Sequence, residues 1–211
     1  MGRLFSLIVL VLLIPFSGKT WAEEAPASKR FDLSAGFRYS VPTGEEESGF
    51  KWSDFYDDGV GGSFEIGYRV TQHLTLHGGV SYDTFKGKAF LANTPLGVAV
   101  GKFSNQSPLT LYLGMKTYFL AVATPQQASG VNPYLRFDIG ATRFKAVDIS
   151  GFQLGQSSTE LSVGAGVGVD VLTMTNLILF MEAKYQNYGT PDQAGNSFKA
   201  IPLSFGLRYL I

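Results

Sequence analysis

The chain has 211 residues, its 17 basic side chains balance 17 acidic ones, and it contains no cysteine. The balanced charge gives no indication of nucleic-acid binding. The absence of cysteine excludes disulfides, a lipoprotein anchor on cysteine and thiolate metal sites.

Residues 1–22 have the pattern of a secretory signal peptide. Arg3 precedes an apolar run over residues 4–15, and Thr20-Trp21-Ala22 supplies a small–x–small cleavage pattern. The run is too short to span a bilayer. The proline and the glycine near its end disfavour the alternative, a retained anchor helix. We therefore expect cleavage after Ala22.

The rest of the chain is expected to form a single domain. Residues 23–30 are predicted to be a short periplasmic lead-in, because they are polar and contain alanine and proline. Predicted strands and their connections fill nearly all of residues 31–211, which we therefore expect to be one outer-membrane β-barrel domain.

Eight segments carry apolar side chains at every second position, with small, polar or charged ones between them. In the last segment Leu203, Phe205 and Leu207 share one face, whereas Ser204 and Arg208 share the other. The predicted strands are residues 31–41, 62–70, 74–84, 109–120, 133–144, 158–172, 177–188 and 200–211.

Lipid explains the apolar face of these strands better than a protein layer does. A soluble sheet needs a second layer over its apolar face, and the sequence has no amphipathic helix to supply one. The sequence therefore predicts an all-β protein, an eight-stranded antiparallel up-and-down transmembrane β-barrel.

The predicted connections alternate in length, as in outer-membrane barrels with long outer loops and short periplasmic turns. This pattern and the even strand number place both termini in the periplasm. One nominal turn, residues 121–132, is as long as an outer loop. The long links are residues 42–61, 85–108, 145–157 and 189–197, and the short ones are 71–73 and 173–176.

Aromatic residues on the outward face are expected to form girdles at the two membrane interfaces, where amphipathic rings are favoured. The alternative is ordinary strand aromatics of a soluble sheet. The predicted girdle residues are Tyr39, Phe64, Tyr68, Tyr82, Phe119, Tyr185 and Tyr209.

The inward face carries nearly equal numbers of basic and acidic residues. In an eight-stranded barrel side chains fill the bore, so the favoured interpretation is a structural plug of ion pairs across neighbouring strands. The alternative is a narrow polar pore, with luminal space beside Gly164, Gly166 and Gly168. The predicted luminal charge cluster is Glu65, Lys116, Arg136, Asp138, Asp170, Glu182 and Arg208; Arg38, Arg69, Asp83 and Lys184 share its face.

No catalytic, cofactor-binding or metal-binding residue is predicted. The glycines of residues 164–168 lack the strand-to-helix context of a phosphate-binding loop. An outer-membrane lipid-modifying enzyme would place histidine beside a hydroxyl or carboxylate near the outer rim. The chain's histidines, His73 and His77, fall near the first short turn instead. We expect them to be solvated or to face phosphate.

The first long link, residues 42–61, mixes acidic residues with aromatic ones. Its carboxylates do not have the spacing of a calcium loop. Its rings, those of Phe50, Trp52, Phe55 and Tyr56, must either fold over the barrel mouth or contact an extracellular partner.

Two segments resemble the small outer-membrane β-barrel superfamily, which includes OmpW, OmpA/OmpX and opacity-type proteins. They are Asn132-Pro133-Tyr134-Leu135 and the closing run from Pro202 to Tyr209. The resemblance implies insertion by the barrel-assembly machinery through the C-terminal strand, although Ile211 stands where the family usually has phenylalanine. It also implies contact with outer-membrane lipid and lipopolysaccharide.

The sequence thus predicts a non-enzymatic integral protein of a Gram-negative outer membrane, with a structural or surface-interaction role. The first alternative is a narrow channel for small molecules, hydrophobic ones included. The second is the lipid-modifying enzyme. Fold alone does not choose among these roles.

Overall fold

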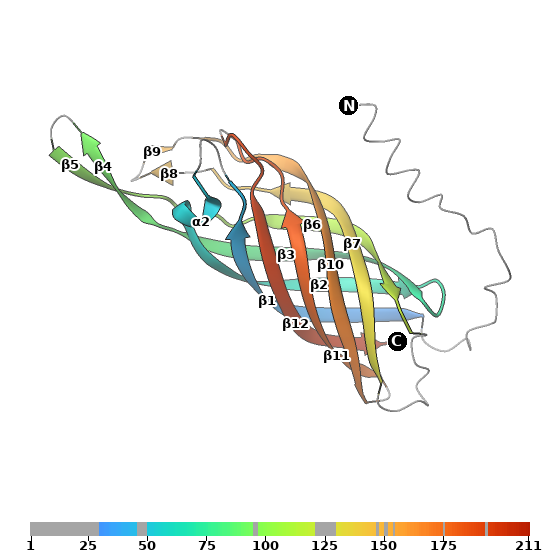
Figure 1. Cartoon of the computed structure of the whole chain (residues 1–211). Helices are drawn as coiled ribbons and strands as arrows, with labels where there is room; N and C mark the ends of the chain where they lie inside the picture. The colour runs from blue at the N-terminus through green and yellow to red at the C-terminus, as the bar shows by residue number, and fades with distance from the viewer. Residues whose placement is uncertain are drawn as a thin grey trace.

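The computed structural model contains a closed barrel of eight antiparallel strands (Figure 1). It describes residues 30–45, 50–94, 97–120, 130–146, 148–149, 152–153, 155–174, 176–192 and 194–211. The barrel strands are β1 (Phe31–Thr43), β2 (Tyr56–Arg69), β3 (Leu74–Gly87), β6 (Leu109–Tyr118), β7 (Val131–Arg143), β10 (Thr159–Met174), β11 (Leu177–Asn187) and β12 (Lys199–Leu210).

Each strand pairs with the next barrel strand along the chain, and β12 closes the barrel on β1. Phe37 of β1 lies opposite Phe205 of β12, and their rings are 5.2 Å apart on the outer face. Phe205 is 56% exposed while its neighbour Ser204 is 7% exposed, as the two-residue period of a barrel wall requires. The predicted strand number, topology and face assignment are confirmed.

The two ends of the barrel differ. One end, here called the turn end, carries the C-terminus and the short turns between β2 and β3 and between β10 and β11 (Figure 1). The other, the loop end, carries the long connections. Several strands run further towards the loop end than their sequence pattern predicts: β2 begins at Tyr56 and β3 ends at Gly87.

This extension corrects one girdle residue. Phe64 lies opposite Ala35 and Val80, inside the extended β2 rather than near its end. The remaining six predicted girdle residues all have outward, exposed rings.

The long connections contain regular structure that the sequence pattern did not reveal. A short helix, α2 (Trp52–Phe55), precedes β2. The segment after β3 forms a hairpin of β4 (Ala89–Thr94) and β5 (Gly97–Lys102), and two short strands, β8 (Asp148–Ile149) and β9 (Phe152–Gln153), follow β7. Among the described residues no helix is long and apolar enough to cross a bilayer.

Three predictions fall largely outside the described residues. The signal peptide, the cleavage after Ala22 and the lead-in of residues 23–30, except Arg30 itself, lie outside the described residues. Most of the long link 121–132 is also outside them, although β7 already begins at Val131. The Asn132 side-chain amide donates to the Leu120 carbonyl across that link at 3.2 Å.

Candidate functional site

The structure places all seven residues of the luminal charge cluster inside the barrel, with at most 6% of any of them exposed. Side chains alternate between the two faces of a strand. Because the apolar residues of β2, β6, β7, β10, β11 and β12 face outward, the residues between them face the lumen. A buried charge is costly unless it is paired and hydrogen-bonded. The pairing of these groups therefore determines what the lumen can do.

Arg136 of β7 is the hub of the cluster. Its Nε donates to Asp138 Oδ2 at 2.9 Å, and its Nη1 donates to Glu182 Oε2 at 3.1 Å. The same Nη1 lies against Glu65 Oε1. One guanidinium thus neutralises carboxylates from three strands, which suits its forked set of donors.

Two lysines and two tyrosines complete the shell around this hub. Lys116 Nζ donates to Glu65 Oε2 and Lys184 Nζ donates to Asp138 Oδ2, both at 2.7 Å. The hydroxyl of Tyr112 donates to Glu65 at 2.8 Å, and a second tyrosine, Tyr134, donates to Glu182 at 3.1 Å.

Arg208 forms a second group nearer the turn end. It contacts Asp170 and donates to the Ser34 hydroxyl at 3.0 Å and to the Tyr118 hydroxyl at 2.9 Å. Its Nε is also 3.5 Å from an oxygen of Asp32, a buried acid that the sequence count left out. With Asp32, six buried acidic side chains face five buried basic ones and the half-buried Arg69.

Most of the ion pairs skip a strand, which corrects the expectation that they would join neighbouring strands; Arg208 and Asp32, on the adjacent β12 and β1, fit that expectation. Lys116 on β6 reaches Glu65 on β2 past β3, and Arg136 on β7 reaches Glu182 on β11 past β10. The neighbouring positions are unsuitable partners. Lys116 lies directly opposite Arg136 in register, and Asp138 lies opposite Gly114.

The glycines of β10 do not leave luminal space, which is a second correction. A Cβ at Gly168 would meet the Tyr134 ring at 2.3 Å, and one at Gly166 would meet the Lys184 backbone and side chain at 2.8–3.0 Å. A Cβ at Gly164 would meet Gln186 at 2.7 Å. Because these glycines have no side chain, larger luminal side chains such as Tyr134 can pack directly against the β10 backbone.

A third luminal group lies nearer the loop end. Arg38 binds Asp83 through two nitrogens, each at 3.0 Å from a carboxylate oxygen. The hydroxyls of Ser40 and Tyr188 donate to the same carboxylate at 3.1 and 2.8 Å. This pair is fully enclosed, since Arg38 is 2% exposed and Asp83 is 0% exposed.

Above this group an aromatic cluster closes the barrel mouth. We call it the mouth cluster; its members are Trp52, Tyr56, Phe85, Phe144, Tyr188, Phe198 and Ala200. Phe198 is its centre, with the Trp52 and Phe85 rings each 5.0 Å away. The sequence reasoning missed this cluster. The sequence does carry a signal for it. Along β3, β7 and β11 the inward-facing positions hold charged residues first and aromatic ones towards the loop end.

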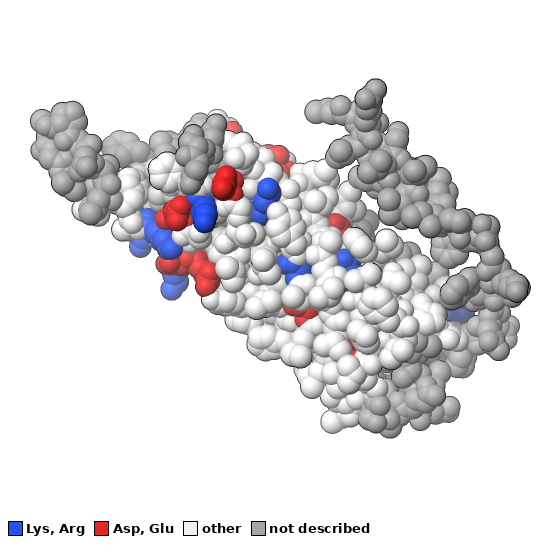
Figure 2. All heavy atoms as spheres, viewed as in Figure 1, with Lys and Arg blue, Asp and Glu red and all other residues white. Residues whose placement is uncertain are grey.

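The mouth cluster contains two of the four rings of residues 42–61. Trp52 and Tyr56 fold over the mouth, and the Trp52 indole N–H donates to the Ser197 carbonyl at 2.9 Å. Phe55 packs at the edge of the cluster, and Phe50 remains 56% exposed beside it. The described acidic side chains of this link, those of Glu45, Asp54, Asp57 and Asp58, are exposed. Figure 2 shows charged groups gathered at the loop end over a mostly uncharged wall.

His77 is a third correction. It is 4% exposed inside the lumen, where its Nε2 lies 2.8 Å from Asp138 Oδ1, so it is neither solvated nor facing phosphate. The reason is its parity, since it shares the inward face of β3 with Thr75 and Ser81. His73, in the turn, is half-buried with Nδ1 3.1 Å from the Tyr118 carbonyl. Within the described part of the chain no group of His, Asp and Glu has the arrangement of a metal site.

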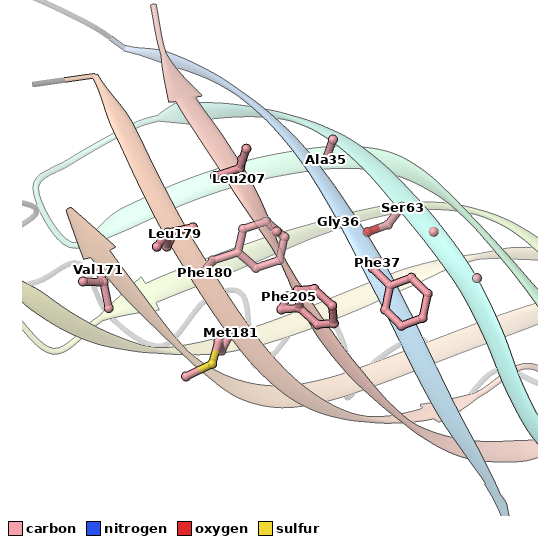
Figure 3. A pocket seen from close by; sticks show the side chains of 13 residues that line it. Ala35, Gly36, Phe37, Ser63, Val171, Leu179, Phe180, Met181, Phe205 and Leu207 are labelled. Carbon is pink, nitrogen blue, oxygen red and sulfur yellow. The ribbon is translucent and has the colours of Figure 1, made fainter. Parts of the chain in front are cut away.

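A shallow pocket lies on the outer wall rather than in the lumen (Figure 3). Small residues of β1 and β2, among them Ala35 and Gly62, line it together with the rings of Phe37 and Phe205. Ser63 is the single polar side chain in its lining. Such a lining suits hydrocarbon.

Comparisons with known proteins agree with this geometry. No family model matches the sequence, and no curated protein sequence matches it significantly. Solved structures do match. Neisserial surface protein A is 19% identical with a TM-score of 0.58, over 86% of this chain and 97% of that one. The outer-membrane protein OprG from Pseudomonas aeruginosa is 13% identical with a TM-score of 0.58, over 87% of this chain and 96% of that one.

The chain has the fold of the small outer-membrane β-barrels. At these identities the likeness establishes the fold alone, and function has to be argued from the lumen and the loops.

Proposed function

We propose that this protein is an integral outer-membrane barrel of a Gram-negative bacterium whose lumen is a structural plug, and that its role is structural or in surface interaction. One observation carries the proposal: charged side chains inside the bore pair with partners two or three strands away, and the mouth cluster lies above them. A path for solute would have to break several charge-assisted hydrogen bonds, which are strong in a low-dielectric interior.

The outward face supports the proposed location. Leu111, Leu113 and Leu161 are each at least 62% exposed, and burying such a wall in hydrocarbon is the favourable outcome. Lipid and lipopolysaccharide are therefore the proposed immediate partners. The barrel-assembly machinery is the proposed partner of β12, whose outward side chains include Leu207 and Tyr209.

A non-enzymatic role is part of the proposal. Catalysis by histidine needs a ring nitrogen within reach of a substrate or nucleophile. One ring nitrogen of His77 is held by Asp138, and the whole ring is enclosed in the lumen. At the loop end, residues 42–61 keep Asp57 and Asp58 exposed, which makes this acidic face the proposed site for an extracellular partner.

Conductance of the purified protein in planar bilayers tests the plug. We expect no steps of conductance above the bare bilayer, with a general porin as positive control in the same chamber. Adding small hydrophobic solutes should change nothing. Regular single-channel steps from the wild-type protein would refute the plug and support the narrow channel instead.

A further inference from the structure

Two basic side chains stand on the outer face of the wall where β7 reaches the loop end. Arg143 is the last residue of β7 and Lys145 follows two positions later; both are exposed. Thr142 and Phe144, which alternate with them, are 0% and 1% exposed inside the barrel. Since successive side chains of an extended chain point to opposite faces, Arg143 and Lys145 point outward, with their Cα atoms about 7 Å apart.

The sheet holds both residues in place. Arg143 lies in register with Leu109 of β6 on one side and with Thr159 of β10 on the other. The Gln106 side-chain amide donates to the Lys145 carbonyl at 3.2 Å. The two charges are therefore carried by ordered backbone at the rim of the wall.

Their position matches the polar boundary of a membrane. The girdle residue Tyr82 lies opposite Leu109 on β3, about 10 Å from Arg143 across β6. From this level towards the middle of the wall β6 presents Leu109, Leu111 and Leu113, which are 41%, 62% and 69% exposed. The two basic groups thus lie where hydrocarbon gives way to headgroups.

Neither charge is neutralised within the described part of the protein. Its ion pairs all join other side chains. Glu160 follows Thr159 on β10 but has the inward parity, and Asp148, three residues after Lys145, is half-buried and takes part in none of these pairs. Arg143 and Lys145 therefore remain available to an anion from outside.

A third outward base, Lys86 of β3, does not belong to this site. The bulge of β2 sets Asp57 and Asp58 beside it, between the register pairs that flank Lys86. Both carboxylates are exposed and would repel a phosphate there. The basic site is thus confined to the β7 side of β6.

We propose that Arg143 and Lys145 bind a phosphate group of lipopolysaccharide in the outer leaflet, with its acyl chains lying against the leucines of β6. A guanidinium binds phosphate through two parallel hydrogen bonds, and the ammonium adds a second charge. Lipopolysaccharide is favoured over phospholipid because the loop end is the proposed outer end, where this glycolipid forms the leaflet. The inference names the site of a partner already proposed, and it rests on the proposed location.

Native mass spectrometry of the full protein in detergent tests the proposal, with bisphosphoryl lipid A as the probe. We expect one lipid A per barrel at low concentration, and weaker binding of phosphatidylglycerol. Arg143→Gln and Lys145→Gln should each weaken the binding of lipid A about fivefold, and the double variant about twentyfold. Arg143→Lys keeps the charge and should retain most of the binding.

Lys51→Gln is the matched control. It removes one positive charge from an exposed position at the same end of the barrel, but in the link of residues 42–61. It should bind lipid A as the wild type does. A shift in gel mobility between unheated and boiled samples shows for each variant that the barrel has folded.

The absence of cysteine allows the bound lipid to be located. A dye is attached to Thr159→Cys, whose exposed position lies opposite Arg143, or to Val41→Cys, which is 37% exposed on β1. In nanodiscs of phosphatidylcholine, one nitroxide-labelled lipid A per barrel should quench the dye at position 159 more than the dye at position 41.

Four results would overturn the inference. Lipid A binding that is undiminished in Arg143→Gln/Lys145→Gln would remove the site, and equal quenching at the two dye positions would place the lipid elsewhere. Equally tight binding of phosphatidylglycerol would assign the two residues to anionic lipid in general. A dimer that the double variant loses, with no lipid A bound, would assign them to the acidic loop of a second copy.

Failure of the proposed location is distinguishable from these results. It would appear as loss of the protein from the outer-membrane fraction of cells, whereas the binding of lipid A is measured on the purified protein.

Discussion

Removing the hub of the luminal charge cluster should destabilise the barrel through one particular carboxylate. In Arg136→Met, Glu65 keeps Lys116 at 2.7 Å and Asp138 keeps Lys184 at 2.7 Å. Among the described residues Glu182 keeps only the Tyr134 hydroxyl, at 3.1 Å. Breaking a buried ion pair so that one charge is left uncompensated costs about 3–5 kcal/mol. We expect the free energy of unfolding to fall by this amount. It should not fall by three times as much, because only one of the three carboxylates that contact Arg136 is left without a basic partner.

The structure supplies both a rescue and a control for this experiment. Arg136→Met/Glu182→Gln removes the stranded charge as well, so it should be more stable than Arg136→Met alone. Arg143→Met makes the same substitution at an exposed position on the same strand and should change stability by less than about 0.5 kcal/mol.

The free energy of unfolding can be measured by urea titration in phospholipid vesicles. The fluorescence of Trp52 is a suitable signal, because this indole is 5% exposed in the mouth cluster and becomes solvated on unfolding. The reasoning is refuted if Arg136→Met costs no more than Arg143→Met, or if the double variant is as unstable as the single one.

Three further outcomes are expected. Leu113→Arg should lower the free energy of unfolding by about 2–4 kcal/mol in the same titration, because Leu113 is 69% exposed in the middle of β6 and meets hydrocarbon. Phe50→Arg, at the loop end, should lower it little. Equal costs would contradict the face assignment. Phe198→Ala should cost about 3–5 kcal/mol, because Phe198 is 0% exposed at the centre of the mouth cluster, and a loss below 1 kcal/mol would mean that the cluster is loosely packed. A peptide tag after Glu47 should be detected by antibody on intact cells, since it interrupts no barrel strand; a tag accessible only after lysis would reverse the proposed orientation.

The sequence by itself determined the barrel. A side-chain period of two reports which face of each strand meets an apolar environment, and this depends only on neighbours along the chain. The strand number, the outward Leu203, Phe205 and Leu207, and the inward Arg136, Glu182 and Arg208 could all be read in this way. The same rule applied to His77 would have placed it in the lumen.

The ends of the strands were less predictable. At the loop end the outward residues no longer face a uniform apolar solvent, so the alternation fades while the backbone pairing continues. β2 therefore begins at Tyr56, in a stretch that reads as a loop, and β4 and β5 pair in a segment whose apolar residues do not alternate strictly.

Only the tertiary structure decided which luminal groups meet. The bore is narrow enough for a long side chain to reach beyond the adjacent strand. Lys116 on β6 therefore pairs with Glu65 on β2, two strands away, and not with a residue of an adjacent strand. Such pairs join positions far apart in sequence, and their choice depends on where Gly114, Gly166 and Gly168 leave room. The mouth cluster is decided in the same way, because Trp52 and Phe198 come together only when two separate connections fold over one opening. A periodic pattern records the environment of each residue, but contacts across a closed barrel depend on the three-dimensional path of all eight strands at once.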